Sequence, residues 1–225
     1  MISHQHKCIF IHIPKTAGTS INSFFHPGVK FHFDNPDYER LFGWCPKRQL
    51  HMQHATSKQL IETGLVTEEQ WTSYFKFAFV RNPWDRAYSD YLFIQDFAGV
   101  KGSFKDYLDK KNEFQRILIN TSGSHYLGDH LLAQTEFFDE ENYKLDFIGR
   151  FENFDSDIQL VLDRLSINEK FNEHRNKSLR VKNYSNFYTN SKIKMVQNKY
   201  AEDILKLEYS FEDNRTGFNI LKRFL

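Results

Sequence analysis

The sequence predicts an α/β fold, with a parallel β-sheet flanked by helices, in a single domain that covers residues 1–225. Strand–loop–helix patterns recur along the chain, which is typical of a parallel sheet with helical crossovers. The length of 225 residues suits one domain, and no repeat or flexible linker divides it. With 40% hydrophobic and 26% charged residues, the chain is neither fibrous nor strongly disordered.

The first strand–loop–helix pattern begins at Cys8. Residues Cys8–Ile13 form an apolar, β-branched segment of the kind that is buried in a parallel sheet. Pro14–Gly18 interrupts it, and the helical spacing of apolar residues resumes in Thr19–Phe25. The sequence therefore predicts a strand, a tight loop and a helix.

A second pattern follows the same order. Lys76–Val80 is the predicted strand, and residues 83–94 are the predicted helix, with Asn82 as its N-cap and Pro83 in its first position. Other patterns predict four further elements. These are short helices opened by capping boxes at Thr56 and Thr67, a strand at Asp146–Phe151, a helix over about 154–165, and one long amphipathic helix over 189–208.

Charge and composition limit the possible partners and locations. A net charge of +1 gives no reason to expect nucleic-acid binding. No segment approaches the roughly 18 apolar residues that a membrane span needs, and no signal peptide is evident. Cys8 and Cys45 alone do not form a disulfide framework. We expect a cytoplasmic, bacterial protein; the oligomeric state is not indicated.

The loop Ile13–Ser20 is the sharpest chemical signal. A loop that leaves a strand and opens a helix directs backbone N–H groups toward one point, where the helix dipole also favours an anion. Lys15 adds a positive charge, Gly18 allows close approach, and three residues add hydroxyl groups: Thr16, Thr19 and Ser20. The order differs from the Walker A pattern, because here the lysine precedes the glycine. A plain strand-to-helix turn would explain only Gly18 and one hydroxyl.

A second candidate anion site lies in residues 79–89. Arg81 ends the second strand and Ser89 lies two turns into the following helix, so both could reach one phosphate. In the alternative interpretation, Arg81 pairs with Asp85 or Asp90 and Ser89 is a small packing residue. Local chemistry alone leaves these alternatives open.

Together, the two motifs resemble the sulfotransferases that use 3′-phosphoadenosine 5′-phosphosulfate (PAPS), specifically the Golgi-type carbohydrate sulfotransferase family (sulfotransferase family 2) and its bacterial relatives. Residues 13–20 look like the 5′-phosphosulfate loop of the family, and residues 79–89 look like its 3′-phosphate motif. Further family-like segments are Phe147–Asn153, Asn176–Ser178, Tyr200–Ile204 and Tyr209.

This resemblance implies a P-loop-like sheet and a metal-free transfer of a sulfuryl group from PAPS to a hydroxyl, with 3′-phosphoadenosine 5′-phosphate (PAP) as product. Lys15 would hold the phosphosulfate, and Arg81 and Ser89 would hold the 3′-phosphate. The remaining donor-binding residues would complete the loop or close over the nucleotide: Thr16, Ala17, Gly18, Thr19, Ser20, Asn176, Lys177 and Ser178. The acceptor would be a saccharide or glycoconjugate, whose identity the sequence does not show.

The attacking hydroxyl requires a base, and histidine has the most suitable pKa. His54 is our choice, because its His-Ala-Thr segment looks like the catalytic segment of relatives; His51 is the reserve. His12 alternates within the first buried strand and is set aside. A zinc site at Cys45, His51 and His54 lacks a regular spacing and a fourth ligand.

Two other functions compete with the sulfotransferase. A P-loop kinase acting on a small molecule would need Mg²⁺ and the usual Lys-Ser/Thr loop order, which this loop lacks. A catalytically inactive glycan-binding relative would keep the fold without the reaction.

Overall fold

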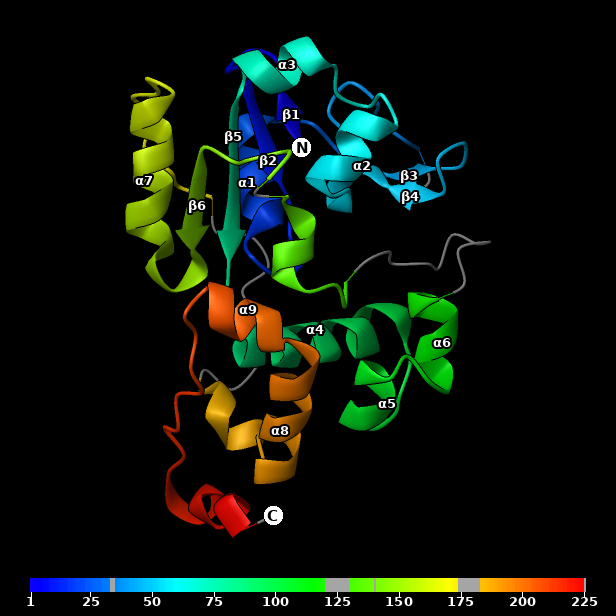
Figure 1. Cartoon of the computed structure of the whole chain (residues 1–225), viewed down its shortest axis with the longest axis vertical. Coiled ribbons are helices and arrows are strands. Elements are labelled where there is room, and N and C mark those ends of the chain that lie inside the picture. The colour runs from blue at the N-terminus through cyan, green and yellow to red at the C-terminus, as the bar shows by residue number, and fades with distance from the viewer. Residues whose placement is uncertain (33–34, 120–129, 140, 174–182, 225) are drawn as a thin grey trace.

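The core of the molecule is a four-stranded sheet in the order β1-β2-β5-β6. The computed structural model describes residues 1–32, 35–119, 130–139, 141–173 and 183–224. Strand β2 pairs in parallel with β5, and β5 pairs in parallel with β6, while the short β1 is antiparallel to β2 (Figure 1). The strands span Ile2–Ser3 (β1), Cys8–Ile11 (β2), Phe75–Val80 (β5) and Phe147–Arg150 (β6). The predicted α/β fold with a flanked parallel sheet is confirmed.

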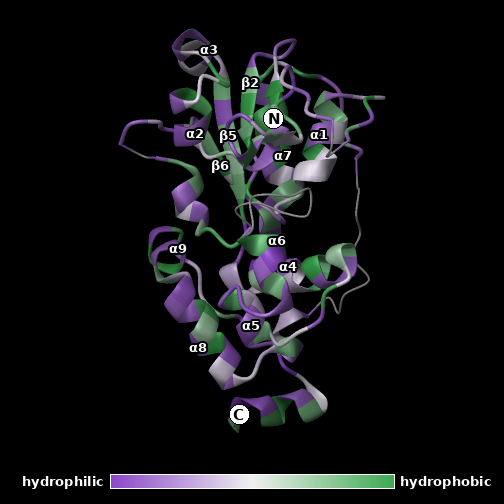
Figure 2. Ribbon diagram, turned by 90° about the vertical axis from the view of Figure 1, so that its right-hand side faces the viewer, coloured by the Kyte–Doolittle hydropathy of each residue, from purple (hydrophilic) through white to green (hydrophobic). Residues whose placement is uncertain are grey.

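Alternating side chains of β2 and β5 enter two different cores. Phe10, Phe77 and Phe79 face the core that helices α1 (Gly18–Phe25) and α7 (Phe154–Arg164) cover. The intervening residues, among them Ile9, Ile11, Ala78 and Val80, face a second core. Because side chains alternate along a strand, this pattern buries both faces of the sheet. In Figure 2, β2 is accordingly green and the surface helix α3 mainly purple.

The second core lies under a small helical and hairpin layer. Both predicted capping boxes form: the hydroxyls of Thr56 and Thr67 accept the N–H groups of Gln59 and Gln70. This layer consists of the hairpin strands β3 (Trp44–Cys45) and β4 (Leu50–His51), the 3₁₀ turn η1 (Met52–His54), and helices α2 (Ser57–Glu62) and α3 (Glu68–Ser73). Both cysteines are buried and free.

A layer of helices lies at the carboxyl ends of the parallel strands. Helix α4 (Pro83–Ala98) begins as predicted, with Asn82 Oδ1 accepting the N–H of Trp84 and Pro83 in the first turn. Figure 1 shows α4 below the point where β5 ends, with α8 and α5 beneath it. The elements not yet named are α5 (Phe104–Leu108), α6 (Glu113–Leu118), η2 (Gln134–Phe137), η3 (Phe151–Asn153), η4 (Tyr184–Phe187), α8 (Asn190–Lys199), α9 (Ala201–Lys206) and η5 (Gly217–Phe224).

The prediction of one helix over 189–208 is wrong. Tyr200 leaves the helical conformation, with φ −116° and ψ 33°, and separates α8 from α9. The Tyr200 ring is buried, and its hydroxyl donates to the Leu131 carbonyl at 3.4 Å. The break redirects α9, so that Asp203 reaches the backbone N–H groups of η2. A tertiary contact, absent from the amphipathic pattern, therefore divides the helix.

No helix in the described part of the chain is both long enough and apolar enough to cross a membrane.

Candidate active site

The first loop connects β2 to α1 in a strained backbone conformation. Lys15 and Ala17 have φ values of 71° and 69°, in the left-handed region that residues with a Cβ rarely adopt. The Thr16 hydroxyl donates to the Ile13 carbonyl at 2.8 Å and fixes the turn. Left-handed residues in a loop of this kind help to form the concave arrangement of N–H groups that suits an anion, and strain of this kind clusters at functional sites.

The second loop meets the first because β2 and β5 are neighbours in the sheet. Their carboxyl ends lie together, which is where α/β proteins of this kind hold ligands. Arg81, directly after β5, donates through Nη1 to the Lys15 carbonyl at 2.9 Å. The Lys15 ammonium lies 3.8 Å from the ring centre of Phe93 on α4. The two predicted motifs therefore lie in direct contact.

Arg81 is buried and forms the ion pair that the alternative interpretation expected. Its Nε and Nη2 donate to Asp85 Oδ2 at 2.8 and 2.6 Å, and its guanidinium stacks on Phe151 at 4.1 Å. Ser89 is buried, two turns into α4. Phosphate binding by Arg81 and Ser89 stays a prediction, and it would require Arg81 to share or exchange its Asp85 contact.

Three histidines gather beside the first loop. The ring centre of His54 lies 4.5 Å from that of His12 and 5.0 Å from that of His130. β2 ends at Ile11, so the expectation that His12 lies within the strand is wrong, although its ring packs on Phe10 and His54. For that reason the sequence pattern did not indicate His12 as a site residue. His130 was not indicated either, because it is distant in sequence and carries no motif.

A backbone contact sets the tautomer of His54. Its Nδ1 lies 3.0 Å from the His12 carbonyl oxygen, which can only accept, so Nδ1 carries the proton and Nε2 has the lone pair. Burial, and then the neighbouring imidazoles of His12 and His130, hold the pKa of His54 well below its usual value. His54 is therefore neutral at pH 7 and can accept a proton at Nε2.

The other candidate residues lie around this cluster or outside the described residues. The reserve residue His51 packs its ring against Trp44, at 5.1 Å, in the β3–β4 hairpin. Among the described residues, no group of three or more histidine, cysteine or acidic side chains could hold a metal ion. The segment Asn176–Ser178 is outside the described residues.

Gly18 is required by the position of His12. A Cβ at Gly18 would lie 1.8 Å from Nε2 of His12, and the ring also stacks on Phe10 at 5.4 Å and contacts His54. The ring thus has little space to move. We expect Gly18→Ala to lower the free energy of unfolding by about 1–3 kcal/mol, as overpacking typically does, measured by urea denaturation.

A double-mutant cycle tests the cause of that loss. In a His12→Ala background the clash disappears, so Gly18→Ala should cost clearly less stability than in the wild-type chain. Additive losses would show that Gly18 is needed for a reason unrelated to the His12 ring.

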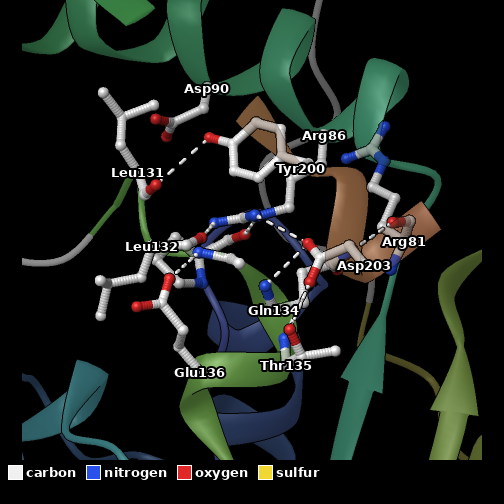
Figure 3. A network of polar contacts seen from close by, with 12 residues as sticks. Arg81, Arg86, Asp90, Leu131, Leu132, Gln134, Thr135, Glu136, Tyr200 and Asp203 are labelled. Carbon is white, nitrogen blue, oxygen red and sulfur yellow. Dashed lines mark hydrogen bonds and ion pairs between the residues drawn. The ribbon is translucent and has the colours of Figure 1, made fainter. Parts of the chain in front are cut away.

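A buried polar network joins helices α4 and α9 to the segment over residues 131–135 (Figure 3). The Arg86 guanidinium donates to the carbonyls of His130 and Leu132, both at 2.8 Å, and its Nε lies 3.4 Å from the Pro14 carbonyl. The Asp203 carboxylate lies 4.0 Å from Arg86 Nη1 and accepts the N–H groups of Gln134 and Thr135. Helices α4 and α9 thereby fix the segment that carries His130.

The fold and the two joined loops define an α/β protein in which a loop suited to an anion lies beside a neutral histidine. The family model of sulfotransferase family 2 matches residues 1–210, a range that includes both loops and all three histidines. The chain therefore belongs to the sulfotransferase family. Membership indicates an enzyme that transfers a sulfuryl group to a hydroxyl-bearing acceptor. No curated protein and no solved structure matches the chain.

Proposed function

We propose that the protein is a PAPS-dependent sulfotransferase that sulfates a hydroxyl of a carbohydrate or glycoconjugate, with His54 as general base. One observation carries the proposal: the strained loop with Lys15 and the neutral His54 meet at the carboxyl ends of the same parallel strands, with His12 touching both Gly18 and His54. The anionic donor of the sulfuryl group and the base that deprotonates the acceptor hydroxyl can therefore lie next to each other.

The residues of the two loops are suited to the donor. The charge of Lys15 and the N–H groups of Thr16–Ser20 would meet the phosphosulfate of PAPS. Arg81 and Ser89 would hold its 3′-phosphate, and Asn176–Ser178 would close over the nucleotide. The direct contact of Arg81 with the Lys15 carbonyl supports one continuous donor site, because it places the second motif against the first.

The reaction follows from these positions. His54 removes the proton of the acceptor hydroxyl at Nε2, while the hydroxyl oxygen forms the new bond to sulfur. The bond between sulfur and the bridging phosphate oxygen breaks, and its electron pair stays on that oxygen. Lys15 stabilises the negative charge that develops there, which is the largest contribution such a site can make. PAP leaves with two phosphate groups, and no metal ion takes part.

A transfer assay tests the proposal. We expect the wild-type chain to move labelled sulfuryl from PAPS to members of a saccharide panel, with mass spectrometry locating the product, and to do so in excess EDTA. Because Lys15 and the loop N–H groups would neutralise the negative charge of the donor, chelation of metal ions should change the rate less than twofold.

Calorimetry should show tighter binding of PAP than of 5′-AMP by about tenfold or more, since a charge-assisted contact contributes roughly 1.5–3 kcal/mol.

The competing functions give other results. Loss of activity in EDTA with rescue by Mg²⁺, and phosphoryl transfer from ATP, would indicate the small-molecule kinase. Binding of saccharides without any transfer would indicate the inactive glycan-binding relative. Equal affinity for PAP and 5′-AMP would contradict the assignment of the 3′-phosphate site.

A further inference from the structure

Resting on the proposed function, we propose that His130 is a second catalytic histidine: the proton that leaves the acceptor hydroxyl comes to rest on its imidazole, where Asp90 stabilises the charge. His54, whose Nδ1 is hydrogen-bonded to the His12 carbonyl, serves as the first acceptor.

His130 has the partner that a proton-holding histidine requires. Its Nδ1 lies 2.6 Å from Asp90 Oδ1, and both side chains are buried. Tyr107 donates its hydroxyl to the other carboxylate oxygen of Asp90 at 2.8 Å. A carboxylate that accepts the Nδ1 proton fixes the ring orientation, leaves Nε2 as the reactive atom, and stabilises the imidazolium once it forms.

Asp90 is ionised in this pocket. Burial raises the pKa of Asp90, but the hydrogen-bonded His130 ring, the charge of Lys15 and the Tyr107 hydroxyl together bring it below its usual value. The two histidines differ in their surroundings: a protonated His54 would lie among other imidazoles, whereas a protonated His130 would lie beside a carboxylate. Asp90 therefore provides a counter-charge for an imidazolium at His130.

Helix α4 positions His130 at two points. Arg86 and Asp90 lie one turn apart on α4; Arg86 holds the His130 carbonyl at 2.8 Å, and Asp90 holds its ring. Phe93, three residues further along α4, stacks on the His130 ring with an interplanar angle of 5°. Three residues of one helix thus fix a histidine that the fold would not otherwise need to orient.

The transfer balances in two proton steps. His54 Nε2 takes the hydroxyl proton as the oxygen–sulfur bond forms and the sulfur–phosphate oxygen bond breaks. The proton then passes from His54 Nε2 to His130 Nε2, across rings whose centres lie 5.0 Å apart. His54 returns to its neutral form with the proton on Nδ1, and His130 is left as an imidazolium paired with Asp90.

The ionisable groups around His130 come from several elements. Asp90 and Arg86 reach it from α4, and Tyr107 reaches its partner Asp90 from α5. Lys15, in the first loop, interacts electrostatically with Asp90, and His12, just before that loop, interacts electrostatically with His130. His54 faces the His130 ring from η1. Asp90 is the member of this set that is negatively charged and bonded to the ring.

Asp90→Asn is the test, because asparagine keeps the shape and a hydrogen-bonding oxygen but removes the charge. We expect kcat at pH 7 to fall by about 10²-fold or more. Loss of the carboxylate removes the negative charge that would stabilise an imidazolium at His130, so the acidic limb of the pH–rate profile should move to lower pH. Affinity for PAP should stay within about twofold. A purely structural role for Asp90 would lower activity without moving the limb.

Two further variants and one spectroscopic measurement complete the design. Asp96→Asn is the matched control, the same substitution at an exposed position of α4, and should keep the wild-type rate and profile. If Asp90→Asn does not fold, His130→Gln replaces it, with the same expected loss of kcat and no loss of PAP affinity. Histidine-labelled NMR, with the His130 signal identified from His130→Gln, should show that the environment of the His130 ring changes in Asp90→Asn.

The outcomes separate the two proposals. If the wild-type chain transfers no sulfuryl group at all, the proposed function fails and this inference fails with it. If the wild-type chain is active, while Asp90→Asn or His130→Gln keeps the wild-type kcat and acidic limb, the function stands and the role of His130 is overturned.

Discussion

Replacing His54 with alanine is expected to lower the rate of sulfuryl transfer by about 10²–10⁴-fold, the usual loss on removing a general base. Affinity for PAP should stay within about twofold, because His54 contacts the His12 carbonyl and the neighbouring imidazoles rather than either phosphate loop through its own side chain. The measurements are turnover with the best acceptor of the panel and PAP affinity by calorimetry, for each variant.

Lys15→Ala should behave differently. In the wild-type chain the Lys15 ammonium would stabilise the phosphosulfate both in the bound donor and in the transition state. We therefore expect both the affinity for the donor and the rate of transfer to fall. The comparison separates a residue that acts on the proton from one that acts on the anion. His51→Ala, in the adjacent β4, is the control for disturbance of this region and should remain active. An inactive His51→Ala together with an active His54→Ala would mean that the base is assigned to the wrong histidine.

The elements predicted correctly are those whose signals are local. The strands at Cys8 and Lys76, the caps at Asn82, Thr56 and Thr67, and the two loops depend on periodicity and capping within a few residues. These local signals were enough to indicate a parallel sheet and the loops at its carboxyl edge.

The missed features depend on contacts between distant segments. Helices α5 and α6 are short and bury aromatic side chains against α4, so no long amphipathic pattern marks them. His130 is recognised as a candidate site residue through its contact with Asp90, 40 positions earlier in the sequence. For Arg81, the sequence favoured neither Asp85 nor a phosphate as its partner. Sequence spacing does not report such pairings, because the fold brings the partners together.

The break at Tyr200 shows the same limit in a single residue. The pattern from 189 to 208 is continuous, and nothing local ends the helix at Tyr200. The helix is divided because a redirected α9 allows Asp203 to satisfy two buried N–H groups and lie beside the buried Arg86. Those contacts outweigh the propensity of one uninterrupted helix.

Asp203→Ala is therefore expected to destabilise the chain by about 3–5 kcal/mol, the range for removing one member of a buried charged pair. Asp203 is fully buried; its carboxylate accepts the N–H groups of Gln134 and Thr135 at 2.8 and 2.9 Å and the Thr135 hydroxyl at 3.0 Å. Alanine would leave these donors unsatisfied and the charge of Arg86 without its carboxylate, at 4.0 Å. Urea denaturation followed by circular dichroism measures the loss.

Glu202→Ala is the matched control, because it removes an equal charge from the same first turn of α9 and so the same interaction with the helix dipole. Glu202 is exposed and its ion pair with Lys206 lies at the surface, where such pairs contribute little, so we expect a change of at most about 0.5 kcal/mol. A similar loss in both variants would mean that Asp203 acts through charge at the helix start alone. A large loss in Asp203→Ala only, with Asp203→Asn intermediate, would show that the contacts to η2 and Arg86 are what divide the helix and hold the segment that carries His130.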